Sequence, residues 1–175
     1  MIAADKSTLL IIDFQERLAP VIDGGAAAIA QAGKLARAAA LLGVPTFYTE
    51  QNPRGLGPTV PELAPAPQQI VTKTAFDASC ASGLLERIHQ DHAVVLAGVE
   101  THICVLQTAL GLLNAGRRVY VAADAVGSRK PESKALGLER MARHGAEIIT
   151  IEMALFEWLG ASTHPRFKEI SALIK

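Results

Sequence analysis

Short aliphatic runs recur along the chain and are separated by longer polar or alanine-rich stretches. Each run has the length and the continuous apolar character of a strand that other elements cover on both faces. Thr8 to Asp13, which reads TLLIID, is the clearest example. The pattern predicts strands at 8–13, 46–49, 69–72, 94–97, 119–122 and 148–151.

The stretches between these runs carry helix signals. Residues 26–42 are rich in alanine, which has the highest helix propensity, and Gly43 and Pro45 follow as stop signals. Further helices are expected at 83–90, 102–114, 132–143, 156–159 and 165–174.

Strands that alternate with helices at this spacing indicate parallel β-α-β units. We therefore predict an α/β fold: a doubly wound, Rossmann-like and mostly parallel sheet of six strands with helices on both faces. No internal repeat or linker divides the chain, so residues 1–175 are expected to form one domain. The proline- and glycine-rich segment 53–67 is a candidate lid or partner-binding loop, and a stiff surface connection is the alternative.

Composition limits the kinds of partner. Hydrophobic residues make up 50% of the chain and charged residues only 19%, so part of the burial is expected between subunits of a homo-oligomer. Lys plus Arg and Asp plus Glu both number 17, which leaves no net charge to attract nucleic acid or an anionic membrane. The N-terminus lacks a basic region before a short apolar run, so a cytoplasmic protein is expected, with Cys80 and Cys104 reduced.

Ligands of a doubly wound sheet bind beyond the carboxyl ends of its strands. The polar residues at those ends are Asp13, Glu50, Lys73, Glu100 with Cys104, and Asp124. The turn after the first strand contains no glycine, and neither GxGxxG nor GxxxxGK[ST] occurs, which excludes the usual dinucleotide and nucleotide sites. No cofactor is therefore expected.

The five histidines are scattered, and only His89 and His92 are near each other, so no metal site is predicted. These two are expected to be a solvated surface pair. His102 lies in the turn ahead of Cys104, where it either orients a substrate or has a capping and hydrogen-bonding role.

Cys104 follows a strand and a polar turn at the expected start of a helix. The partial positive charge there favours a thiolate, although a buried structural cysteine is the alternative. Asp13 and Lys73 end or follow other strands, so the fold can bring a carboxylate, an ammonium group and a thiol to one rim. Together these groups supply the nucleophile, base and cation of a covalent hydrolase. Taken separately, the alternatives are that Asp13 caps a turn and that Lys73 is a solvated loop lysine.

The chain resembles the isochorismatase-like cysteine hydrolase superfamily, and within it the branch of isochorismatase domain-containing proteins. The resemblance spans nearly the whole chain. It rests on LLIIDFQ at 9–15, TEQNPRGLGPTVPEL at 49–63, VTKTAF at 71–76, GVETHICVLQTAL at 98–110, DAVGSR at 124–129 and HPRFKEISALIK at 164–175.

The resemblance implies catalytic roles for Asp13, Lys73 and the nucleophile Cys104. It also implies a cis peptide at Val99-Glu100, with an oxyanion hole formed by the N–H groups of Glu100 and Cys104. Candidate substrate-pocket residues are Phe14, Gln15, Gln51, Phe76 and His102, with core packing as the alternative for the two phenylalanines.

The activity implied by the resemblance is hydrolysis of a small amide- or carbamoyl-type C–N bond through a thioester. The metal-binding cluster of nicotinamidases is missing after the second strand, where the chain reads Thr49 to Asn52, and this argues against a metal and against nicotinamide. The alternatives are isochorismatase-like ether hydrolysis by Asp13 and Lys73, and a non-catalytic interaction module. Cys80 is expected to be structural, Asp124 to serve a turn or subunit contact, and Ser128 with Arg129 to cap a helix.

Overall fold

The computed structural model describes residues 1–175 and contains a parallel sheet with the strand order β3-β2-β1-β4-β5-β6. This is the strand order of the dinucleotide-binding doubly wound fold. The predicted α/β architecture is thus confirmed, and every pair of neighbouring strands is parallel. The strands are β1 (Ser7–Ile12), β2 (Thr46–Gln51), β3 (Ile70–Lys73), β4 (Ala93–Val99), β5 (Val119–Gly127) and β6 (Glu147–Ile149).

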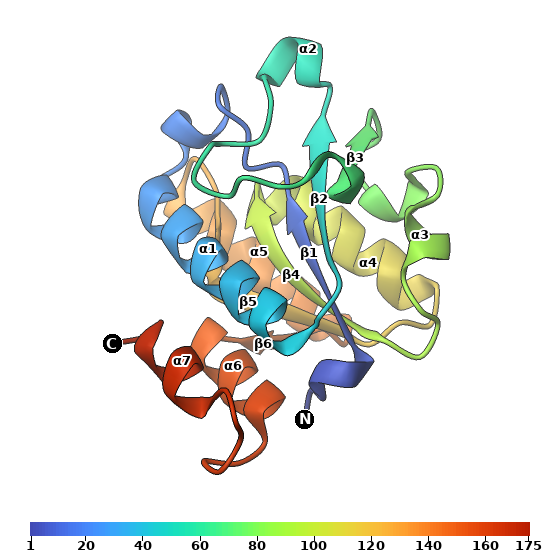
Figure 1. Ribbon diagram of the computed structural model, residues 1–175. Coiled ribbons are helices and arrows are strands. Elements are labelled where there is room, and N and C mark those ends of the chain that lie inside the picture. Colours follow the sequence, from blue (N-terminus) through green and yellow to red (C-terminus); the bar gives the residue numbers. More distant parts are fainter.

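Helices cover both faces of the sheet (Figure 1). Successive side chains of β1 point to opposite faces, so Leu9 and Ile11 pack in one core cluster and Leu10 and Ile12 in the other. Helices α1 and α6 pack on the first face, and α3, α4 and α5 on the second. The helices are α1 (Gly25–Leu42), α2 (Pro53–Leu56), α3 (Leu84–Arg87), α4 (Leu106–Asn114), α5 (Pro131–Arg143), α6 (Ile151–Leu159) and α7 (Phe167–Ala172).

Several predicted elements differ in length or type from those observed. The helix expected at 83–90 is a single turn, Leu84–Arg87. The helix expected at 102–114 begins as a π-helical segment, Thr101–Val105, before α4 starts. The helix expected at 156–159 starts earlier, since the Thr150 side chain accepts a hydrogen bond from the Met153 N–H and caps α6 at its N-terminus.

Asp124 does not end a strand. Strand β5 continues to Gly127, and its register against β4 shifts between Leu96 and Gly98. Asp124 lies in this irregular part of β5, and its Oδ1 accepts a hydrogen bond of 2.9 Å from the Ile151 N–H at the start of α6. A carboxylate at a helix N-terminus is favourable, so Asp124 stabilises the junction of sheet and helix. None of the helices is both long and apolar enough to cross a bilayer.

Gly98 allows β1 and β4 to approach closely beside the carboxyl ends of both strands. Its φ is +127°, and a Cβ atom there would lie 2.1 Å from the Ile12 carbonyl oxygen and 2.5 Å from the Ile12 nitrogen. Both are backbone atoms of the sheet, so no side-chain rotation can relieve the clash. The position of the segments after β1 and β4 therefore depends on glycine at 98.

We expect Gly98→Ala to lower the free energy of unfolding by on the order of 3 kcal/mol, because it adds steric overlap to an unfavourable φ. Gly145→Ala is the matched control: its φ is +100°, but a Cβ there has no heavy atom within 4 Å. The control should cost about 1 kcal/mol. Urea unfolding of both variants measures the difference, and equal losses would contradict the close-approach argument.

Candidate functional site

The candidate site lies where the connections from the sheet change direction. Strands β1 and β4 are neighbours. The chain continues from β1 to β2 on one side of this pair and from β4 to β5 on the other side. In an open α/β sheet, this point is the crevice where ligands bind. Asp13 follows β1 here, and Glu100 to Cys104 follow β4.

Asp13 is buried at the end of β1 in an unusual backbone conformation. Its φ is +52°, in the left-handed region that non-glycine residues rarely adopt. Its side chain has no exposed surface, and each carboxylate oxygen has a partner. The Thr49 hydroxyl donates to Oδ1 at 2.6 Å, and Lys73 Nζ donates to Oδ2 at 2.7 Å. The turn and these two hydrogen bonds therefore fix the position of the carboxylate.

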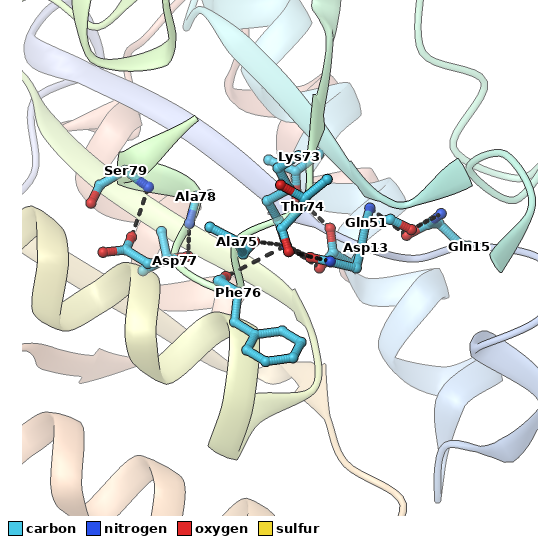
Figure 2. Close-up of polar contacts among 12 residues, drawn as sticks. Asp13, Gln15, Gln51, Lys73, Thr74, Ala75, Phe76, Asp77, Ala78 and Ser79 are labelled. Atoms are coloured by element: carbon cyan, nitrogen blue, oxygen red, sulfur yellow. Dashed lines mark hydrogen bonds and ion pairs between the residues drawn. The ribbon is translucent and has the colours of Figure 1, made fainter. Parts of the chain in front are cut away.

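Lys73, at the end of β3, is also fully buried, unlike a solvated loop lysine. Figure 2 shows its ammonium group among acceptors from three segments. Besides Asp13, Nζ donates to Gln51 Oε1 at 2.8 Å and to the Ala75 carbonyl at 3.4 Å. Gln51 is held in turn because its Nε2 donates to the Thr74 carbonyl at 2.7 Å. A buried ion pair needs such additional hydrogen bonds, and this one has them on both sides.

Cys104 lies in the π-helical segment Thr101–Val105 and is buried, with 6% of its surface exposed. Burial, and after it the negative charge of Asp13, raises the pKa of the Cys104 thiol to about 12, while Lys73 opposes the shift. The position of Cys104 at the start of a helix predicted a thiolate. Burial beside a carboxylate favours the neutral thiol more strongly than the helix start favours the thiolate. The resting thiol is thus protonated at neutral pH, and its use as a nucleophile requires a base.

The raised pKa of Cys104 predicts that its reaction with methyl methanethiosulfonate accelerates with pH beyond 9 and up to about 12. The same cysteine in the urea-unfolded chain should reach half of its maximal rate near pH 9. Since unfolding lets the thiol ionise at lower pH, the stability that this shift contributes is complete below pH 9 and lost as pH rises toward 12. Mass spectrometry of the modified Cys104 peptide measures both rates, and a folded-state plateau near neutral pH would contradict the prediction.

A cavity of about 140 Å³ opens beside these groups. Five of its eight lining residues were expected at the site: Asp13, Gln51, Phe76, Glu100 and Cys104. Lys73 does not line it, but lies behind Asp13 and borders a separate hollow of about 210 Å³ with Cys80. The remaining three residues were not predicted from the sequence, because they carry no polar signal and are spread over three segments: Leu18, Leu56 and Ile103.

Three expected pocket residues lie outside this cavity. Phe14 packs in the core cluster that faces α1, because the left-handed turn at Asp13 ends the strand alternation. Gln15 clamps two segments: its Oε1 accepts from the Gln51 N–H at 2.8 Å and its Nε2 donates to the Gly57 carbonyl at 2.6 Å. The His102 ring lies 3.0 Å from the Ser128 hydroxyl, measured at Nδ1. Gln15 thus acts on the site indirectly, since it holds the backbone of Gln51.

The backbone at the end of β4 has a cis peptide bond between Val99 and Glu100, and the Glu100 N–H donates no hydrogen bond within the chain. The Glu100 side chain is turned to other partners: its carboxylate accepts from the Arg129 N–H at 2.9 Å and from Arg129 Nε at 3.1 Å. Arg129 therefore neutralises Glu100 rather than serving the expected helix cap.

No group of three metal-ligating side chains gathers anywhere in the protein. The rings of His89 and His92 lie side by side with centroids 5.1 Å apart, and Nδ1 of His92 is 3.0 Å from the Thr8 hydroxyl. Thr8 belongs to the start of β1, so this pair lies at the end of the sheet opposite Asp13.

Comparison with known proteins gives a consistent result. A family model described as the isochorismatase domain matches residues 7–153. Isochorismatase domain-containing protein 2 of Bos taurus is 41% identical over 171 residues, covering 97% of this chain and 83% of that protein. Protein 2A of Mus musculus is 39% identical over 175 residues, covering 99% and 85%. The solved structure of a MAR1 ribonuclease from Caenorhabditis elegans is 36% identical, with a TM-score of 0.93 and coverage of 99% and 91%.

Proposed function

Because the chain belongs to the isochorismatase family of hydrolases, we propose that it hydrolyses a small amide- or carbamoyl-type C–N bond with Asp13, Lys73 and Cys104 as catalytic residues. One observation carries this proposal: the buried Asp13–Lys73 pair and the Cys104 thiol meet at the switch point of the sheet. Nucleophile, base and cation are the groups that covalent acyl transfer needs.

The first half of the reaction forms an acyl-enzyme. Asp13 accepts the Cys104 proton as the sulfur attacks the substrate carbonyl carbon, and Lys73 stabilises the charge that develops on the sulfur. The Glu100 N–H, which has no partner in the chain, and the Cys104 N–H are the proposed donors to the tetrahedral oxyanion. When the C–N bond breaks, protonated Asp13 returns its proton to the leaving nitrogen, and ammonia or an amine departs from the thioester.

The second half regenerates the enzyme. Asp13 takes a proton from a water molecule, whose oxygen attacks the thioester carbon. Collapse of the second tetrahedral intermediate breaks the C–S bond, the sulfur regains a proton from Asp13, and a carboxylic acid is released. The raised pKa of Cys104 agrees with this sequence, because a thiol that is protonated at rest must lose its proton to a base during each turnover.

A second candidate comes from the name of one similar structure, a MAR1 ribonuclease. RNA binding relies on cationic side chains that contact phosphates. The cavity at Cys104 is lined by two acidic residues and no cation, and the chain as a whole has 17 basic and 17 acidic residues. These observations favour a small-molecule substrate over RNA.

The test is a panel of small amides, ureides, isochorismate and a short RNA, assayed for release of ammonia, acid or nucleotides. We expect ammonia from an amide or ureide, together with a transient acyl adduct on Cys104 that mass spectrometry detects after acid quenching. Turnover of isochorismate or RNA alone, without an adduct on Cys104, would reject the proposal. The homo-oligomer expected from the composition is a separate proposal, which light scattering tests.

A further inference from the structure

We propose that the cavity at Cys104 selects neutral, short-chain aliphatic amides and discriminates against substrates that carry a carboxylate. This inference rests on the proposed function, and it deepens it by naming the substrate class. Three features of the cavity support it: its apolar walls, the pairing of the charges around it and its volume.

The walls that the catalytic groups leave free are apolar. Leu18, Leu56, Phe76 and Ile103 come from four separate segments and line the cavity together with Cys104. The polar side chains of two lining residues already have partners: Asp13 binds Lys73 and Thr49, and both Gln51 side-chain ends are hydrogen-bonded. A substrate tail beyond the reacting carbonyl therefore contacts hydrocarbon.

The charges around the cavity are compensated in pairs. Asp13 is paired with Lys73 at 2.7 Å, and Glu100 with Arg129 at 3.1 Å. No lining residue is a cation, so a substrate carboxylate would lose its hydration without gaining a partner. A neutral tail avoids this cost.

The volume of the cavity limits the size of the substrate. An apolar protein cavity of about 150 Å³ holds a molecule of the size of benzene, which has six heavy atoms. The cavity here measures about 140 Å³. Butyramide also has six heavy atoms, so its carboxamide and three-carbon tail match this space. Phe76 is the one exposed residue of the lining, at 52%, so it marks the side of the cavity that opens to solvent.

A pair of alkylating agents tests charge selection without requiring turnover. Iodoacetamide is neutral and carries an amide, whereas iodoacetate is anionic; with each, sulfur displaces iodide and the thiol proton leaves. Each rate at Cys104 is divided by the rate with 2-mercaptoethanol in the same buffer. We expect a normalised preference for iodoacetamide of about tenfold or more. Equal rates, or a preference for iodoacetate, would overturn the proposal.

The variant Phe76→Lys places a cation at the mouth of the cavity and should reduce the preference by about threefold or more. Phe156→Lys is the matched control, since Phe156 is also an exposed phenylalanine (42%) but lies on α6 and does not line the cavity. The control should leave the preference unchanged. If both variants change it equally, bulk charge rather than the cavity lining determines the selectivity, and the proposal fails.

Hydrolysis of butyramide and succinamate separates this inference from the proposed function. The two amides differ by a terminal methyl group or carboxylate, and kcat/KM should favour butyramide by about tenfold or more. If succinamate is the better substrate, amide hydrolysis stands and selection for neutral amides is wrong. If neither is hydrolysed but Cys104 still prefers iodoacetamide, the cavity selects neutral amides and the hydrolase function fails.

Discussion

Replacement of Cys104 by alanine is expected to lower kcat/KM for amide hydrolysis by on the order of 10⁴-fold or more, as removal of a covalent nucleophile does in other hydrolases. No serine, threonine or second cysteine lines the cavity, and the thioester proposed above cannot form without the thiol. Cys104→Ser should be nearly as inactive, because a hydroxyl ionises less readily than a thiol. Steady-state ammonia release and the loss of the acyl adduct measure the effect.

Cys80→Ala is the control for this experiment. Cys80 is exposed and borders the hollow on the other side of Lys73, outside the cavity of Cys104. Its replacement should leave kcat/KM within about twofold of wild type, as for most surface substitutions. Hydrolysis of isochorismate by Cys104→Ala would favour the ether-hydrolysis alternative, in which Asp13 and Lys73 act without the thiol. Retention of every cellular activity in both Cys104→Ala and Asp13→Asn would favour a non-catalytic module.

The buried framework of the protein can be predicted from sequence because its signal is local. Strand β1 was expected at 8–13 and is observed at Ser7–Ile12, since a continuous aliphatic run has few alternatives in a fold of this size. Strand β5 was predicted four residues long but spans Val119–Gly127. Its extension contains Asp124 and glycine, which a local strand signal does not include. That part forms because β4 and the start of α6 supply partners that are distant in sequence.

The sequence predicts which residues of the candidate site lie at strand ends, but it does not predict where their side chains point. Asp13, Gln51 and Cys104 line one cavity because they follow or end parallel strands at the same edge. Phe14 and Gln15 are adjacent to Asp13 in sequence, yet the positive φ at Asp13 turns one into the core and the other toward Gly57. Such a turn depends on tertiary contacts, so no periodicity in the sequence reports it.

The pKa of Cys104 could likewise not be predicted from the neighbouring sequence. A helix start next to a polar turn predicts a lowered thiol pKa, but the effect depends on how much of the thiol is buried and on which charges face it. Burial is the largest contribution and Asp13 the next, and both raise the pKa. Neither can be derived from the residues flanking Cys104, because Asp13 is more than ninety positions away in the chain.

Replacement of Lys73 by methionine is expected to lower the free energy of unfolding by about 3–5 kcal/mol, the usual cost of removing one partner of a buried ion pair. Methionine retains much of the apolar stem, but the Asp13 carboxylate keeps only the Thr49 hydroxyl as a partner. Gln51 also loses the donor to its Oε1. Urea unfolding at neutral pH measures the loss, and activity should fall with it because the base is no longer held.

The double variant Asp13→Asn with Lys73→Met separates the loss of the ion pair from the loss of packing. If the cost of Lys73→Met is mainly an uncompensated negative charge, then making residue 13 neutral should recover at least about half of the lost stability, although a second residue has been changed. A deficit that is additive in the double variant would mean that Lys73 stabilises the fold by packing. The ammonium group would then have no structural role, and its position beside Asp13 would have to be explained by catalysis alone.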